Sequence, residues 1–353
     1  MIKNIALRVD TNNNVGLGHL IRIKGFIFRN INIYQKFIII VKGTKNIIAK
    51  NFNHKKIKIY YIKNTNIGGL KNILRIMNYE KCEILISDIS YKNNLLKKNF
   101  FKNYYNFFKN NKIMTVSFDD PRQKIYSDVS IIPYPLKSNF LRTSKKSKIL
   151  KGIRFTCFNK DLKRTKKKIK LVPKNILIAL SGNKHNKISI KILKEILQLK
   201  LNINIKFFSL KKINTRNIFL EKFPKKKIIF LDKINNINSL LDWSDLTIIG
   251  EGLMRFEAAV KGVPSIFLNN VENTSKNTVL INQFLKLGSA FFVNLNDNKK
   301  NIFRIKFLKL YKSNLIRKRQ SHNGFKKFDL KGAYRISRSI NMHYRKTFNS
   351  LQI

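Results

Sequence analysis

Acidic residues are scarce in this chain of 353 residues. It has 18 Asp and Glu against 73 Lys and Arg, for a formal net charge of +55. Basic residues are spread over the whole length, with no basic tail and no RNP-like aromatic motif. Because Lys, Asn, Ile and Phe are all enriched, we interpret the charge as drift towards AT-rich codons. We expect no dedicated nucleic-acid partner, although the charge would raise the encounter rate with an anionic substrate.

Cysteines and long apolar runs are also few. Cys82 and Cys157 form neither a disulfide framework nor a CxxC metal pair, so we expect both to be small buried side chains. Apolar runs such as residues 37–41 are too short to cross a bilayer, and the N-terminus has no hydrophobic signal region. These absences predict a cytoplasmic protein.

Glycine is rare as well, and this makes the remaining glycines informative. Average usage would give roughly 25 in a chain of this length, whereas 14 are present. Several of them stand where an apolar strand-like run meets a helix-like one, as in an α/β fold. The strand-like runs cover residues 5–9, 37–41, 57–62, 84–87, 113–118 and 129–132, then 176–180, 203–209, 228–231, 245–249 and 265–268.

The alternation predicts two domains with parallel sheets. A lysine-rich, weakly periodic stretch at residues 144–170 interrupts the pattern, and we place the linker there. The predicted domains are residues 1–165 and residues 166–353, the second including a C-terminal helix.

The turn after the first strand carries the strongest chemical signal. Gly16 and Gly18 would let the backbone approach an anion at the start of a helix. His19 at that helix start is expected to be a neutral imidazole that can accept a proton, and Arg22 shares its helix face. The alternative is an ordinary strand-to-helix turn capped by a histidine. Asp10 could orient either His19 or Arg8.

The second half repeats this logic. Residues 181–183, Ser-Gly-Asn, follow a strand and precede a helix, which makes them a second candidate phosphate cradle. Further on, Gly252 and Leu253 open a helix that carries Glu257, whose carboxylate could accept hydrogen bonds from both ribose hydroxyls. The alternative for Glu257 is a solvated helix glutamate. We read the adjacent Asp119 and Asp120 as structural or substrate-orienting, because two neighbouring carboxylates make a poor cation site.

Together these motifs resemble the UDP-sugar hydrolase family of pseudaminic acid biosynthesis, with its spore-coat polysaccharide relatives and the related glycosyltransferase that makes lipid II. The opening signature is Arg8-Val9-Asp10 followed by residues 16–22, and the glycine turn with its helix at residues 250–264 is equally specific. Matching segments in the family's order, at residues 117–120, 151–155, 179–183, 244–245 and 329–336, extend the resemblance over nearly the whole chain.

The resemblance implies a GT-B architecture, with two Rossmann-like domains facing a central cleft and UDP held mainly by the C-terminal one. It implies that His19 is the general base for a water that displaces UDP from a diacetamido-trideoxy sugar, without metal or other cofactor. The substrate contacts that we predict are Gly16, Gly18, Arg22, Tyr91, Ser181, Gly182, Asn183, Gly252, Leu253, Glu257 and Asn273.

Two further functions remain open. A GT-B glycosyltransferase in polysaccharide biosynthesis would pass the sugar from UDP to a hydroxyl acceptor instead of to water. A polyanion-binding protein would show salt-sensitive affinity for nucleic acid and no UDP release. The sequence leaves the identity of the sugar and the oligomeric state undetermined.

Overall fold

The computed structural model contains two compact units, and we describe each by itself. The first unit comprises Met1–Lys160 with Leu330–Ile353, and the second comprises Asp161–Asp329. The structure describes residues 3–11, 18–43, 51–63, 66–89, 99–118, 124–136, 141–143, 147–180, 186–208, 227–250, 252–269, 275–295 and 301–347.

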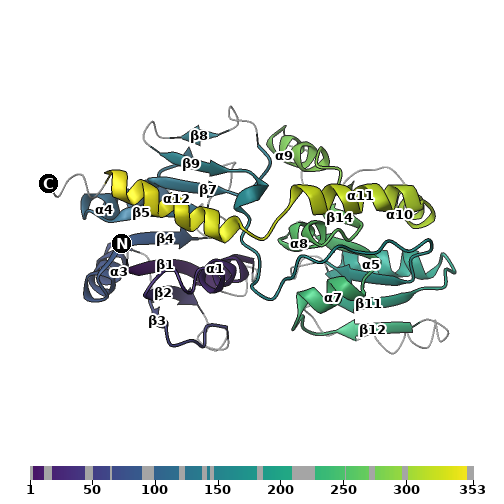
Figure 1. Cartoon of the computed structure of the whole chain (residues 1–353), viewed down its shortest axis with the longest axis horizontal. Helices are drawn as coiled ribbons and strands as arrows, with labels where there is room; N and C mark the ends of the chain where they lie inside the picture. The colour runs from purple at the N-terminus through teal and green to yellow at the C-terminus, as the bar shows by residue number, and fades with distance from the viewer. Residues whose placement is uncertain are drawn as a thin grey trace. The chain divides into compact units, whose positions relative to one another are not determined.

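The first unit is built on a parallel sheet with the strand order β3-β2-β1-β4-β5-β7-β9 (Figure 1). All neighbouring strands in it run parallel. Its strands are β1 (Asn4–Thr11), β2 (Lys36–Gly43), β3 (Ile57–Tyr61), β4 (Cys82–Asp88), β5 (Met114–Phe118), β7 (Val129–Ile132) and β9 (Lys148–Lys151), and β6 (Lys124–Ile125) pairs separately with β8 (Arg142–Thr143). Its helices are α1 (Gly18–Arg29), α3 (Ile67–Tyr79), α4 (Phe100–Asn110), the short 3-10 turn η3 (Ile153–Phe155) and α12 (Gly332–Thr347).

Alternating side chains place two hydrophobic cores on opposite faces of this sheet, as the two-residue period of a strand requires. Ile5, Leu7 and Val9 of β1 belong to the core that includes residues of α1 and α12. Ala6, one position along the strand, belongs to the core that includes residues of α3 and α4. Both faces of the strand are apolar, as expected for a parallel sheet with helices on both sides.

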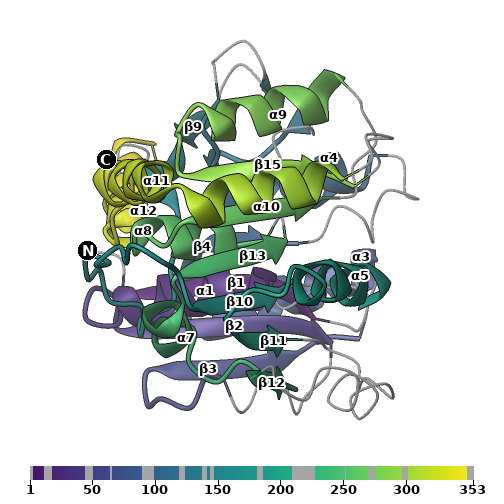
Figure 2. The same ribbon diagram turned by 90° about the vertical axis from the view of Figure 1, so that its right-hand side faces the viewer.

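The second unit repeats this architecture with the strand order β12-β11-β10-β13-β14-β15, again parallel throughout. Figure 2 shows α10 running alongside β15 in this unit. Its strands are β10 (Asn175–Ala179), β11 (Asn204–Phe208), β12 (Lys227–Leu231), β13 (Leu246–Gly250), β14 (Ser265–Asn269) and β15 (Ala290–Asn294). Its helices are α5 (Asn186–Leu197), α7 (Ile237–Trp243), α8 (Met254–Val260), α9 (Ser275–Leu285), α10 (Ile302–Lys312) and α11 (Asn314–Lys327).

The position of the C-terminal helix shows that the predicted domain division was wrong. We expected it within residues 166–353, but α12 belongs to the first unit, and the second unit already begins at Asp161. Ala333, Ile336 and Ile340 lie in the core beside α1. Gly332 lies so close to η3 that a Cβ atom there would stand 2.1 Å from the carbonyl oxygen of Thr156. An apolar stripe predicts that a helix is packed, but it does not say onto which core.

The linker predicted at residues 144–170 contains a strand of the first unit. Lys148–Lys151 form β9, the edge strand beside β7, and only one of its four side chains is buried. A short edge strand flanked by lysines has little alternation for a pattern to detect.

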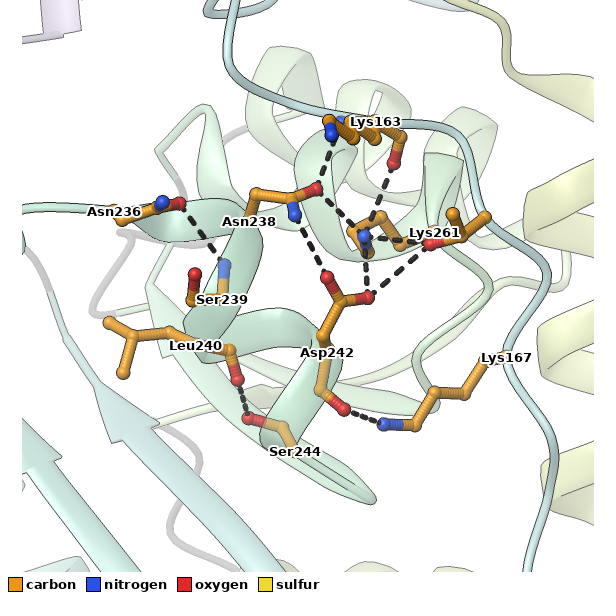
Figure 3. A network of polar contacts seen from close by, with 10 residues as sticks. Lys163, Lys167, Asn236, Asn238, Ser239, Leu240, Asp242, Ser244 and Lys261 are labelled. Carbon is orange, nitrogen blue, oxygen red and sulfur yellow. Dashed lines mark hydrogen bonds and ion pairs between the residues drawn. The ribbon is translucent and has the colours of Figure 1, made fainter.

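A buried lysine fixes the start of the second unit to its helices (Figure 3). Lys261, fully buried just after α8, donates to Thr165 Oγ1 at 2.9 Å and to Asn238 Oδ1 at 2.8 Å, and pairs with Asp242 at 2.6 Å. Its third hydrogen bond goes to the carbonyl oxygen of Lys163. The segment that enters the second unit is therefore tied to α7 and to the helix that carries Glu257.

Within the described ranges, no helix is both long and apolar enough to cross a membrane.

Candidate active site

The carboxyl ends of two neighbouring strands bring His19 and Asp88 together. β1 and β4 are adjacent and parallel, with Val9 opposite Asp88, the last residue of β4. The chain leaves β1 and begins α1 at Gly18, so His19 is the second residue of that helix. His19 Nδ1 lies 2.5 Å from Asp88 Oδ1. The predicted base therefore has a carboxylate partner at the edge where open α/β sheets bind ligands.

Arg22 holds the same carboxylate from the next turn of α1. Its Nε donates to Asp88 Oδ2 at 2.7 Å and its Nη2 donates to Asp88 Oδ1 at 2.5 Å. The guanidinium also lies 5.0 Å from the centre of the Phe118 ring, at the end of β5. A bidentate pair of this kind fixes the orientation of both planar groups.

Asp88 is buried, and its negative charge is maintained by its two partners. Burial alone would raise the pKa of this carboxyl, but the charges of Arg22 and His19 and the hydrogen bonds that they donate hold it below its usual range. Burial alone would lower the pKa of the Arg22 guanidinium. The charge of Asp88 and its hydrogen bonds outweigh burial and raise that pKa above its usual value. Asp88 and Arg22 thus form an ionised pair beside the imidazole.

This arrangement is suited to a proton acceptor. The His19 side chain is 28% exposed, whereas the Asp88 side chain is fully buried. With Nδ1 turned towards Asp88, Nε2 is the ring nitrogen that can exchange a proton with a bound molecule. An imidazole oriented by a carboxylate in this way can act as a general base.

Sequence analysis missed Asp88, and the structure settles the alternatives that it left for Asp10. Asp10 pairs with Arg8 at 2.5 Å, and it is Asp88 that contacts His19. One signal was available in the sequence: Asp88 directly follows the strand-like run at residues 84–87, and the carboxyl ends of adjacent parallel strands meet at one edge of the sheet. What the sequence does not show is that this strand lies next to β1.

The second group of predicted contacts centres on Glu257 in the first turn of α8. Its side chain is buried, at 6% exposure, so it is not a solvated helix glutamate. Burial raises the pKa of this carboxyl to about 7, and among the residues that the structure describes no opposite charge counteracts the effect. Gly252 and Leu253, which precede α8, are partly exposed. A buried carboxyl without a compensating charge is typical of a site that awaits a polar partner.

Several predicted contacts lie outside the described residues, as do Asp119 and Asp120. The substrate contacts concerned are Gly16, Tyr91, Ser181, Gly182, Asn183 and Asn273. In the described part of the chain, no three His, Cys, Asp or Glu side chains come together as a metal site. Cys82 and Cys157 are free and buried, as predicted, and burial raises the pKa of each thiol to about 12.

Comparison with known sequences gives one distant relative. No protein-family profile matches the chain. An uncharacterized protein of Methanocaldococcus jannaschii is 25% identical over 279 residues, which is 75% of this chain and 55% of the relative. The chain therefore spans about half the length of the curated relative that it matches.

Solved structures are similar over nearly their whole length. The Acinetobacter baumannii MurG structure has a TM-score of 0.66 at 13% identity, covering 96% of this chain and 99% of MurG. A putative UDP-N-acetylglucosamine 2-epimerase from Listeria monocytogenes has a TM-score of 0.68 at 12% identity and 98% coverage of both chains. The calicheamicin glycosyltransferase CalG4 has a TM-score of 0.64 at 9% identity, covering 99% of this chain and all of CalG4. Two Rossmann-like units with parallel sheets and these similarities confirm that the chain has the GT-B fold.

Proposed function

We propose that this protein processes a UDP-sugar, with His19 as the base that activates the attacking hydroxyl. The observation that carries the proposal is the contact between His19 and the buried Asp88 at the ligand-binding edge of the first unit's sheet. Solved structures with the same fold include an enzyme named for a UDP-sugar and a glycosyltransferase. A base at this place matches the chemistry that such substrates need.

The proposed reaction is a displacement at the anomeric carbon. His19 Nε2 takes the proton from a hydroxyl, and the hydroxyl oxygen forms a bond to the anomeric carbon. The bond from that carbon to the phosphate oxygen breaks, and UDP leaves with the bonding electrons. The leaving diphosphate needs stabilisation by positive groups, which helix N-termini and cationic side chains can provide.

For the UDP, we propose a site on the second unit. Glu257 would accept hydrogen bonds from the two ribose hydroxyls, because burial raises the pKa of its carboxyl and no opposite charge in the described part of the chain offsets this. Gly252 and Leu253 would lie beside it, at the start of the same helix. Residues 181–183 would hold the diphosphate, and Asn273 a further part of the substrate; Gly16, Gly18 and Tyr91 would complete the set from the first unit.

Of the two reactions, we favour transfer to a hydroxyl acceptor. Its support is the glycosyltransferase with the same fold, together with the similarity to MurG. Hydrolysis, as in pseudaminic acid biosynthesis, is the second candidate, and the opening signature with residues 16–22 supports it. His19 has the same role in both, since water and an acceptor hydroxyl each lose one proton.

One experiment separates these candidates. The protein is incubated with a panel of UDP-sugars, first in water alone and then with a panel of hydroxyl acceptors, and free UDP is measured. Release of UDP only with an acceptor indicates transfer, and release in water with formation of the free sugar indicates hydrolysis. If no UDP-sugar binds and none releases UDP, the proposed function is wrong.

A further inference from the structure

Asp88 is shared between two side chains of one helix. Its Oδ1 lies 2.5 Å from His19 Nδ1 and 2.5 Å from Arg22 Nη2, while its Oδ2 accepts from Arg22 Nε at 2.7 Å. Arg22 Nη2 in turn lies 3.3 Å from His19 Nδ1. The imidazole and the guanidinium therefore depend on the same buried carboxylate.

The contact with Asp88 favours one position for the proton of the histidine. An ionised carboxylate is only an acceptor, so a contact of 2.5 Å with an unprotonated Nδ1 would bring two acceptors together. The contact is favourable only if Nδ1 carries the proton, which leaves Nε2 unprotonated in the neutral ring. Arg22 strengthens this assignment, because it keeps Asp88 ionised and fixes the plane of the carboxylate.

We propose that Arg22 is a positioning residue that acts through Asp88 and sets both the tautomer and the basicity of His19. This inference rests on the proposed function of His19 as a base, and it reassigns Arg22, which sequence analysis placed among the substrate contacts. The Nε–Nη2 edge of the guanidinium, which could otherwise bind a phosphate through two hydrogen bonds, is already occupied by Asp88.

A carboxylate that is shared with a guanidinium stabilises a protonated imidazole less than an unshared carboxylate does. Arg22 neutralises most of the negative charge of Asp88, so the carboxylate stabilises a protonated His19 less than it would alone. Within the described ranges, the other ionisable groups that act on Arg22 are Tyr134 and Cys157. Cys157 is buried with a raised pKa, so it is a neutral thiol near neutral pH. The Phe118 ring supports the guanidinium without competing for Asp88.

Removing the charge of Arg22 should therefore make His19 protonate at higher pH. We expect Arg22→Gln to move the acid limb of the pH–rate profile upward, because an unshared carboxylate stabilises the charged imidazole more strongly. The KM for the UDP-sugar should change little, and kcat should recover at high pH. Arg22→Lys keeps the charge but not the bidentate contact. The acid limb of its pH–rate profile should therefore lie between those of the wild type and Arg22→Gln.

The test combines nitrogen-15 NMR of the histidine rings in the full-length protein with the pH–rate profile. The wild type should show the tautomer with the proton on Nδ1, and Asp88→Asn should abolish that preference. Lys24→Gln is the matched control and should behave as the wild type. Lys24 is another cation on α1, but its ammonium donates to Asn51 and not to Asp88.

The outcomes separate this inference from the proposed function. If Arg22→Gln leaves the His19 titration unchanged but raises KM, Arg22 is a ligand contact and the inference is wrong. If Arg22→Gln does not fold, Arg22→Lys decides by the same titration. If no UDP-sugar is turned over, the proposed function fails, while the NMR titration still decides the effect of Arg22 on His19.

Discussion

Replacing Glu257 with glutamine should stabilise the protein increasingly as pH rises above about 4.5, the ordinary pKa of this carboxyl. The side chain is 6% exposed, and burial raises its pKa from the usual 4.5 to about 7. One pKa unit corresponds to about 1.4 kcal/mol, so ionising this carboxyl in the folded protein costs about 3 kcal/mol. Glutamine has nearly the same shape and no charge, so Glu257→Gln avoids that cost.

The pH dependence follows from proton binding. Between pH 4.5 and about 7 the folded protein keeps the proton on Glu257, whereas the unfolded chain has lost it. The free energy of unfolding of the wild type therefore falls as pH rises through this range and levels off above it. The variant should match the wild type near pH 4.5 and exceed it by about 3 kcal/mol at pH 8.

The assay is denaturant unfolding of both proteins from pH 4.5 to 8.5, following the transition of the second unit by the fluorescence of Trp243, the single tryptophan. Glu195→Gln, on the partly exposed side of α5, is the control and should give no pH-dependent difference. A stability difference for Glu257→Gln that is the same at every pH would refute the reasoning, because it would show that the carboxyl is not ionised against a burial penalty.

Two other perturbations test the second unit. Glu257→Ala should weaken the binding of uridine by about 10- to 100-fold, because two hydrogen bonds to a charged acceptor are lost; calorimetry should also show that wild-type affinity increases as pH rises through about 7, the pKa of Glu257. Unchanged affinity would give this residue a purely structural role. Lys261→Met should destabilise the second unit by about 1–3 kcal/mol, since it removes a buried ammonium that donates to three oxygen atoms and pairs with Asp242. Limited proteolysis should then cut faster within residues 161–170, and equal cutting rates in wild type and variant would contradict the bonding network around Lys261.

Most strands, and the α/β class of the fold, could be predicted because a parallel strand that is buried on both faces has an almost continuous apolar sequence between turns. The run at residues 245–249 became β13 (Leu246–Gly250), and the glycine turn after it leads into the helix that was expected. The same applies to His19 at the start of α1, since its position depends only on the strand, the turn and the helix around it.

Features that depend on distant neighbours could not be predicted in this way. Asp88 is 69 positions from His19, and only the order of strands in the sheet makes them partners. For α12, the choice between two cores depends on the close approach of Gly332 to η3. β15 (Ala290–Asn294), the edge strand beside β14, was also missed.

The most direct test of the account is UDP release by His19→Ala, compared with the wild type and with His322→Ala on the exposed side of α11. All three proteins are assayed with the UDP-sugar and acceptor that support turnover, and UDP binding is measured in parallel. The account predicts that His19→Ala loses turnover by at least about 100-fold while binding UDP nearly as the wild type does, and that His322→Ala keeps both. Turnover retained by His19→Ala would contradict the assignment of His19 as the base.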